Sequence, residues 1–188
     1  QSVTEYVEGF FGYPNTAIIG TRLNAKDHPD IPNKEYLIKG RMIKVPSNYN
    51  PIDGTYSGDW DGNFKYTDLD GSTDPSDNEY IMEWTSNPAW IIYDLLTNKR
   101  YGMGKYNITE EDIDKWSFYQ FSKFCDEQVD VVIDGVQTQE RRHMCNLYID
   151  SERQAYDYIR DLMSIYNTKI NFTAGTIHIV QDAPTDSG

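Results

Sequence analysis

Residues 87–104 read NPAWIIYDLLTNKRYGMG, which predicts a short helix with well-defined ends. Asn87 suits the N-cap, because its side chain can accept a hydrogen bond from a free backbone N–H of the first turn. Pro88 fits the first helical position, where its missing N–H costs nothing. Apolar residues recur at helical spacing and form one stripe: Ala89, Ile92, Tyr93 and Leu96. We therefore predict a helix over residues 88–98 that packs one face into a core.

The residues that follow this helix predict a mixed α+β segment. Gly102 and Gly104 should end the helix, because glycine readily adopts positive φ. The dipeptide Asp134-Gly135 favours a tight hairpin turn. Two further helices are predicted over residues 110–126 and 152–167, and two β-hairpins near residues 129–148 and 169–180.

The preceding half, residues 1–86, carries strand and turn signals. Residues 16–23 and 36–45 are rich in apolar and β-branched side chains. Residues 50–79 are rich in Asp, Gly, Ser and Tyr and predict a long irregular loop. The predicted fold class is thus α+β: a β-rich segment over residues 1–86, then three helices packed with two β-hairpins over residues 87–188.

The composition limits the possible functions. The chain has 188 residues and a net charge of −13, which argues against a basic nucleic-acid-binding face. No apolar run approaches the ~20 residues that span a membrane. With 15 Tyr, 7 Phe and 4 Trp, an ordered core is expected. Because the chain begins with Gln1 and closes on linker-like residues 182–188, we expect it to be an excerpt of a longer polypeptide.

The two cysteines, Cys125 and Cys145, allow at most one disulfide and are expected to be free buried thiols. His143 and Cys145 would share one face of a strand, with Cys125 near them. A structural zinc site takes four ligands in recognisable spacings, which are missing here, so no metal centre is predicted. Arg141 and Arg142 either protect an exposed strand edge or bind acids of a neighbouring subunit.

The acidic loop has some features of a calcium site. Residues 68–79 have the length of an EF-hand loop, with acids at its first, third, seventh and last positions: Asp68, Asp70, Asp74 and Glu79. Thr73 stands where the sharp turn of that loop needs glycine, and Pro75 stiffens it. A solvated acidic loop is therefore the main prediction, with Ca²⁺ at those four acids as the alternative. No cofactor is predicted.

Asp59 and Asp61 are close enough in sequence to suggest an acid/base pair. Glycosidase carboxylates lie roughly 5 to 9.5 Å apart in different environments, which sequence spacing alone does not establish. Trp60 and Phe64 are expected to anchor this segment to the fold. No nucleophile elbow or phosphate-binding glycine loop is present, so no enzyme is predicted.

The amino-acid sequence of residues 87–104 resembles that of the tail tip attachment proteins of long-tailed bacteriophages, the lambda-type host specificity protein J family. Further short motifs resemble the family and occur in the same order along the chain: YPNTA (13–17), GRMIKVPSNY (40–49), WDGNF (60–64), FCDE (124–127), RHMCN (142–146) and GTIHIVQDAP (175–184). The resemblance spans residues 13–184 and is to the central, hub-forming region of that family. Residues 66–80 look like an insertion relative to the family.

The resemblance implies a structural role at the phage tail tip. Such a hub, a homotrimer in the full-length protein, closes the tail tube, binds other tail tip and distal tail proteins, and supports host attachment and DNA ejection. The implied location is the virion tail tip, after assembly in the host cytoplasm. The family motif carries no catalytic or ligand residues to transfer.

Two other functions remain open from the residues. A carbohydrate- or receptor-binding module is suggested by aromatic residues around the acidic loop: Tyr56, Trp60, Phe64, Tyr66 and Tyr80. A tail-associated hydrolase is the second alternative.

Overall fold

The computed structural model describes residues 33, 35, 38–67, 79–149 and 153–182. The chain divides into two units, Gln1–Arg41 and Met42–Gly188. The predicted strand at residues 16–23 and parts of residues 36–45 and 50–79 lie outside the described residues. The fold given below is that of the unit that begins at Met42.

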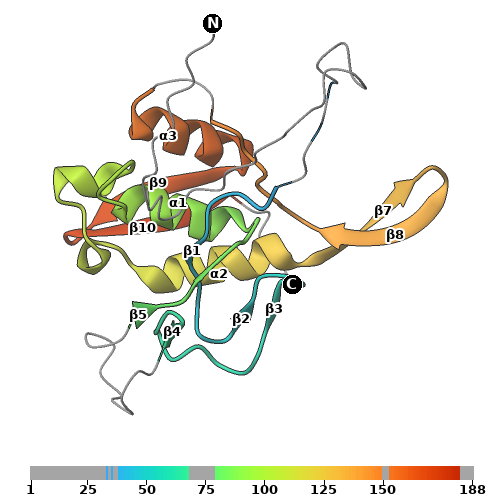
Figure 1. The fold of residues 1–188 in the computed structure, drawn as a ribbon, viewed down its shortest axis with the longest axis horizontal. Helices are drawn as coiled ribbons and strands as arrows, with labels where there is room; N and C mark the ends of the chain where they lie inside the picture. The colour runs from blue at the N-terminus through green and yellow to red at the C-terminus, as the bar shows by residue number, and fades with distance from the viewer. Residues whose placement is uncertain (1–32, 34, 36–37, 68–78, 150–152, 183–188) are drawn as a thin grey trace, which may run out of the picture. The chain divides into compact units, whose positions relative to one another are not determined.

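Helices and antiparallel strand pairs alternate along this unit (Figure 1). The helices are α1 (Pro88–Thr97), α2 (Lys115–Asp126) and α3 (Ala155–Ile165), with 3-10 turns η1 (Met103–Tyr106) and η2 (Glu110–Asp112). The strand pairs are β1 (Ile43–Lys44) with β6 (Met82–Glu83), β2 (Tyr49–Asn50) with β3 (Thr55–Tyr56), β4 (Tyr66–Thr67) with β5 (Glu79–Tyr80), β7 (Gln128–Ile133) with β8 (Val136–Arg141), and β9 (Thr168–Thr173) with β10 (Thr176–Gln181). The predicted α+β class is confirmed.

The helix predicted over residues 110–126 is interrupted near its start. The Asp112 carboxylate accepts hydrogen bonds from the backbone N–H and the hydroxyl of Thr109, which closes the short turn η2. Ile113 is then extended and bridges to Ile177 of β10. A new N-cap, Asp114, starts α2 by accepting from the backbone N–H of Trp116.

The first hairpin is also shorter than predicted. Strand β8 ends at Arg141, and the predicted continuation to residue 148 is wrong. After that point the backbone N–H of Arg142 donates to the carbonyl of Glu127, and that of His143 donates to the carbonyl of Cys125. The chain separates from β7 after Arg141 because its next backbone N–H groups donate to carbonyls at the end of α2.

The ends of α1 are formed partly as predicted. Asn87 caps the helix, since its Oδ1 accepts from the backbone N–H of Ala89 at 3.0 Å, and Pro88 is the first helical residue. Positive φ does not explain the later glycines: Gly102 has φ −104°, and neither it nor Gly104 is among the glycines with positive φ. Instead, a Cβ on Gly104 would collide with the backbone of Thr97, so glycine here allows η1 to pack closely on the end of α1.

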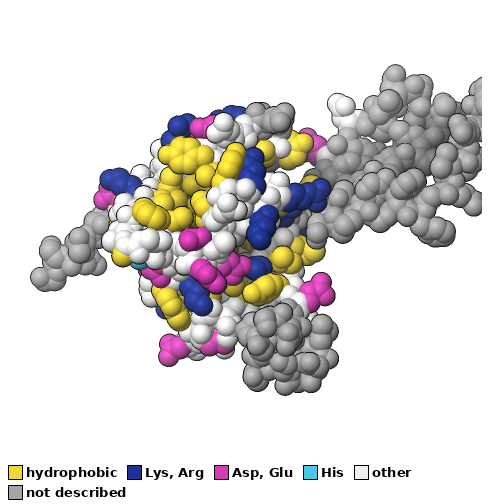
Figure 2. Space-filling model, turned by 90° about the vertical axis from the view of Figure 1, so that its left-hand side faces the viewer, with side chains coloured by type: hydrophobic (Ala, Val, Ile, Leu, Met, Phe, Trp, Pro, Cys, Tyr) yellow, Lys and Arg dark blue, Asp and Glu magenta, His cyan; other side chains and the backbone are white. Residues whose placement is uncertain are grey.

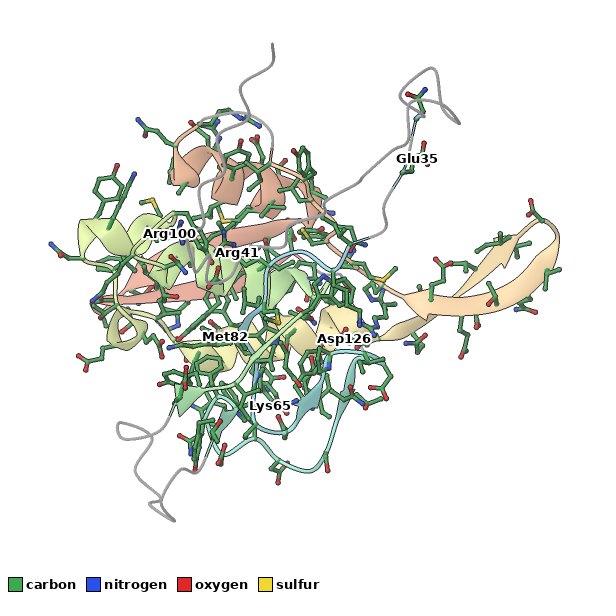
Figure 3. The ribbon with its side chains drawn as sticks, viewed as in Figure 1. Glu35, Arg41, Lys65, Met82, Arg100 and Asp126 are labelled. Carbon is green, nitrogen blue, oxygen red and sulfur yellow. The ribbon has the colours of Figure 1, made fainter. Side chains whose placement is uncertain are left out.

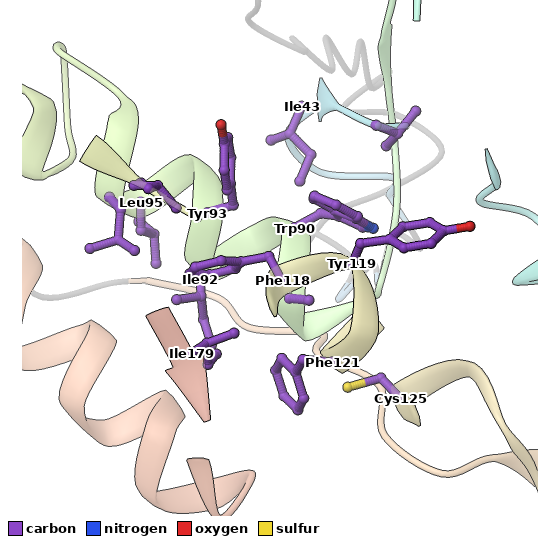
Figure 4. Close-up of a cluster of buried hydrophobic side chains, with 14 of the residues drawn as sticks. Ile43, Trp90, Ile92, Tyr93, Leu95, Phe118, Tyr119, Phe121, Cys125 and Ile179 are labelled. Atoms are coloured by element: carbon purple, nitrogen blue, oxygen red, sulfur yellow. The ribbon is translucent and has the colours of Figure 1, made fainter. Parts of the chain in front are cut away.

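The core lies where α1, α2 and α3 meet (Figure 4). Trp90, Ile92 and Phe118 are fully buried, and Ile159 of α3 is 1% exposed. Trp60 and Phe64 are each 5% exposed, and their ring centroids lie 5.8 Å apart in an edge-to-face contact. These two aromatics therefore anchor their loop to the fold, as predicted.

The loop segments before α1 share this core with the helices. The rings of Trp60 and Trp90 lie 5.8 Å apart, centroid to centroid, and Ile43 and Val45 are buried in the same cluster. The predicted division between residues 86 and 87 thus falls within the unit that begins at Met42.

The closing hairpin β9–β10 packs beside α2. Ile177 and Ile179 of β10 are buried, and the intervening side chains are more exposed. The backbone N–H of Asp114 donates to the carbonyl of Ile177, and that of Ile179 donates to the Ser117 hydroxyl. These bonds tie the start of α2 to the hairpin in a fixed register.

We predict that Gly104→Ala destabilises the fold by about 1–3 kcal/mol, because the added methyl group meets backbone rather than a side chain that can move away. Urea denaturation of the wild-type and variant chains measures this difference. Gly40→Ala is the matched control, since no atom lies within 4 Å of a Cβ built there. Equal midpoints for Gly104→Ala and the wild type would contradict the packing role.

Candidate functional site

A buried carboxylate, Asp126, lies at the end of α2 where several segments meet (Figure 3). The side chain is 2% exposed. Its Oδ2 accepts from the Tyr56 hydroxyl at 2.7 Å and from the Asn87 side-chain amide at 2.6 Å. Arg141 Nη1, at the end of β8, lies 3.6 Å from Oδ1. We call Asp126, Tyr56, Asn87 and Arg141 the Asp126 node.

Burial dominates the electrostatics of this node. Loss of solvation raises the pKa of Asp126, and the hydrogen bonds from Tyr56 and Asn87 and the charge of Arg141 counteract only part of that effect. The pKa of Tyr56 is also raised, first by burial and then by the Asp126 charge. Tyr56, Asn87 and Arg141 all contact the Asp126 carboxylate, so the node joins segments of the fold.

Gly54, in the β2–β3 turn, packs directly against Asp126 and Arg141 of the node. Its φ of +72° favours glycine, and a Cβ there would lie 2.7 Å from Asp126 Oδ1 and 2.8 Å from Arg141 Nε. Arg141 Nη2 also donates to the carbonyl of Ile52 at 2.5 Å. The turn therefore shields the ion pair, and the base of hairpin β7–β8 is attached to α1, α2 and the β2–β3 turn.

This arrangement changes the interpretation of the basic pair. Arg141 is not an edge-protecting or partner-binding residue, because it pairs internally with Asp126. Arg142 Nη2 lies 2.7 Å from the Glu127 carboxylate, at a more exposed position. The node is not predictable from the sequence, because its members are far apart in the chain and the Asn87 N-cap is the one sign of it that a local pattern carries.

Hairpin β7–β8 projects away from the helices (Figure 1). Asp134 and Gly135 both have positive φ, so the predicted turn forms. The strand register places side chains on two faces. The face that we call apolar comprises Val129, Val131, Ile133 and Val136 together with Thr138 and Glu140, and the polar face comprises Gln128, Asp130, Gln137, Gln139 and Arg141 together with Val132.

The apolar face of this hairpin is open to solvent in the described structure. Ile133 is 46% exposed and Val136 is 66% exposed. Two-stranded hairpins gain little stability in water without a packed face. An anchored base and an unburied apolar face are the features expected of an arm that contacts another polypeptide.

Most of the proposed calcium ligands lie outside the described residues. Asp68, Asp70 and Asp74 are among those, and Glu79 lies in β5 opposite Thr67. Within residues 38–67, 79–149 and 153–182, no group of three or more His, Cys, Asp or Glu side chains could hold a metal ion. The calcium alternative thus stays a prediction.

The remaining residues considered from the sequence, one Asp, two Cys and one His, are held by contacts within the fold. Asp61 accepts hydrogen bonds from Asn63 and Ser47; these lower its pKa despite the opposing effect of partial burial. Cys125 and Cys145 are free and buried, as predicted, and burial raises the pKa of both thiols. The strand predicted to carry His143 and Cys145 does not form, because β8 ends before them. His143 packs between rings of α2 and the end of α3.

Charge is not segregated on the face shown in Figure 2, where basic, acidic and hydrophobic side chains are interspersed. The net charge of −13 is therefore not one continuous acidic surface there. None of the helices within the described ranges is long and apolar enough to cross a membrane.

Comparison with known proteins relates the chain to phage tail tips. No family model matches the chain. It is 36% identical over 187 residues to tip attachment protein J of Escherichia phage SECphi27, and 33% identical over 184 residues to tip attachment protein J of Escherichia phage SECphi4. These alignments cover 99% and 98% of the chain but 14% of each relative. The chain is thus related over nearly its whole length to a segment of these proteins, which confirms the resemblance to the tail tip attachment protein family.

We predict that Asp126→Ala destabilises the chain by about 3–5 kcal/mol, because the buried charge of Arg141 loses the carboxylate that pairs with it and the Asn87 amide loses one of its acceptors. Thermal unfolding followed by circular dichroism measures the loss. Asp130→Ala on the exposed hairpin is the control and should change stability by less than about 0.5 kcal/mol. Adding Arg141→Met to Asp126→Ala should recover part of the loss; an additive double variant would contradict the pairing.

We predict that His143 makes the fold less stable as pH falls through about 6.5, its ordinary pKa. Burial, and then the charge of Arg142, lower the pKa of His143 in the folded chain. The unfolded chain therefore gains the proton first, so stability is complete above pH 6.5 and falls until the pH passes the folded pKa. Melting temperatures at pH 7.5 and 5.5 should differ less for His143→Gln than for the wild type. A difference for His143→Gln as large as that of the wild type would contradict this contribution.

Proposed function

We propose that the chain is a structural segment of a phage tail tip protein and belongs to the hub that closes the tail tube. In the full-length protein it would form a homotrimer, bind other tail tip and distal tail proteins, and support host attachment and DNA ejection. We place it at the tail tip of the virion, after assembly in the host cytoplasm. The observation that carries this proposal is the similarity to tip attachment protein J along 99% of the chain.

The projecting hairpin supports an assembly role. Its base is attached through Arg141 to the buried node, and the apolar face defined above lacks a covering partner in the described residues. Burying a Val or Ile side chain contributes roughly 1.5–3 kcal/mol, so this face could stabilise a contact between subunits appreciably. We infer that β7–β8 packs against a neighbouring tail protein or a second copy.

The two alternatives have less support from the site. Among the aromatics nominated for sugar binding, Trp60 and Phe64 are core residues and Tyr56 donates to Asp126. Among the nominated acids, Asp61 is held in a turn by Ser47 and Asn63. We therefore propose no enzymatic activity and no carbohydrate platform at these positions.

A phage that encodes the full-length protein with Val131→Ser and Ile133→Ser should assemble fewer complete tails, because each change removes apolar area from the contact face. A loss of ~1.4 kcal/mol weakens a contact about tenfold, so fewer complete tails and a lower plaque titre are expected, and electron microscopy of lysates and plaque counts measure them. Gln137→Ser with Gln139→Ser alters the polar face and is the matched control.

The hairpin itself should still form in both variants, because the Asp134-Gly135 turn and the Asp126 node are unchanged. Circular dichroism of the purified chains checks this. Normal tails and titre for the Val131→Ser, Ile133→Ser phage would contradict a role of the apolar face in assembly.

A further inference from the structure

Several Asp-Gly steps in this chain have the residue types for a reaction between a side chain and the main chain. In such a step the backbone nitrogen of the glycine can attack the side-chain carboxyl carbon of the aspartate, because glycine has no side chain that hinders the approach. The structure describes three of these steps: Asp53-Gly54, Asp61-Gly62 and Asp134-Gly135. A fourth, Asp70-Gly71, lies outside the described residues. The reactivity of the three described steps depends on what holds their two reacting groups.

The Asp53-Gly54 step is held by hydrogen bonds of its own loop. The Asp53 carboxylate accepts from the hydroxyl of Thr55 at 2.7 Å and from its backbone N–H at 3.1 Å, and it accepts from the Asn50 amide at 3.0 Å. The bond from the Thr55 hydroxyl is the main cause that lowers the pKa of Asp53. The attacking nitrogen is engaged as well, since the backbone N–H of Gly54 donates to the carbonyl of Asn50 at 2.9 Å. Both groups must therefore break hydrogen bonds before they meet.

The Asp61-Gly62 step is held by hydrogen bonds and by packing. The Asp61 carboxylate accepts from the backbone N–H and the side-chain amide of Asn63 and from the Ser47 hydroxyl. Gly62 is buried, and its carbonyl accepts from Lys115 Nζ at 2.6 Å. The peptide group that would have to turn during the reaction is thus fixed in place.

The Asp134-Gly135 step, at the tip of hairpin β7–β8, has none of these restraints. Both residues are exposed. Within the part of the chain that the structure describes, neither the Asp134 carboxylate nor the Gly135 backbone N–H has a hydrogen-bond partner. No atom lies within 4 Å of a Cβ built on Gly135, so its peptide group has open space in which to turn. Because a two-stranded hairpin is only weakly stable in water, the turn that holds Asp134 at φ +51° opens readily.

We propose that Asp134 is a modification site that isomerises spontaneously to isoaspartate. The Gly135 nitrogen bonds to Cγ of Asp134, the C–OH bond breaks, and the hydroxyl leaves as water with the amide proton. Water then adds to the main-chain carbonyl carbon of the resulting succinimide and breaks its bond to the Gly135 nitrogen, so that the chain continues through Cγ. One water is released and one is taken up, and the reaction therefore needs no oxidant and no cofactor.

The product changes the turn that closes the arm. Isoaspartate adds one methylene group to the main chain and carries its carboxylate directly on Cα. The length and type of a hairpin turn fix the register of its strands, so the Ile133–Val136 pair next to the turn loses its alignment. The isomerisation itself is independent of the proposed function. That it weakens a contact made by the apolar face rests on that function.

The test incubates the purified 188-residue chain at neutral pH and physiological temperature. Trypsin then releases the Asp134 step in peptide 124–141 and the other two described steps in peptide 45–65. Electron-transfer fragmentation locates isoaspartate in each peptide, since the isomer has the same mass as aspartate. Synthetic peptides 45–65 and 124–141, incubated alongside, give the rate of each step without the fold.

The fold should slow the three steps to different extents. Relative to the synthetic peptides, Asp53 and Asp61 should isomerise at least about tenfold more slowly in the folded chain, the factor expected when a hydrogen bond to a charged group must break. Asp134 should be slowed by less than this factor. Slowing of Asp134 as strong as that of Asp53 and Asp61, or equal rates at all three steps in the folded chain, would overturn the proposal.

Two variants connect the modification to the arm. Asp134→Gly removes the reactive carboxyl group and keeps a Gly-Gly sequence that suits the same tight turn. Incubation should speed hydrogen exchange of the β7–β8 amides in the wild type and in Asp130→Ala, which keeps the reactive step, but not in Asp134→Gly. Equal acceleration in Asp134→Gly would contradict the effect on the arm. Because these measurements use the purified chain, their failure would leave the hub proposal to its own test in the phage.

Discussion

The side-chain amide of Asn87 is the contact on which the arrangement of this fold depends. Its oxygen accepts from the backbone of Ala89 and starts α1, and its nitrogen donates to the carbonyl of Ser122 and to the Asp126 carboxylate at the end of α2. One planar group therefore begins one helix and fixes it against the end of the other. Through Asp126 the same contact reaches Arg141, so the direction of hairpin β7–β8 depends on it as well.

Such a node contributes more to geometry than to net stability. Removing two charges from water costs several kcal/mol each, and their attraction repays this only when the remaining hydrogen-bonding groups are satisfied. Here Tyr56 and Asn87 satisfy one oxygen of Asp126, and Gly54 allows the turn to cover the pair. We interpret the node as the contact that fixes the direction of hairpin β7–β8. An apolar contact of equal area would fix this direction less precisely.

Sequence alone predicted the features that depend on neighbouring residues. The Asn87 cap and the Asp134-Gly135 turn follow from side-chain and backbone preferences over a few positions. The role of Gly104 was missed because its constraint is the backbone of Thr97, which comes near only once η1 folds back on α1. Arg141 was misjudged for the same reason: its partners, Asp126 and the carbonyl of Ile52, are brought together only by the tertiary fold.

The net charge of the chain limits how closely copies of it can approach one another. At physiological ionic strength charges act over about 8 Å, so copies of a chain with net charge −13 repel most strongly where their acids approach closely. The apolar face of β7–β8 carries one acid of the two strands, Glu140 opposite Val129, whereas Asp130 lies on the other face, so a contact centred on the Ile133–Val136 pair keeps both of these strand acids away from its centre.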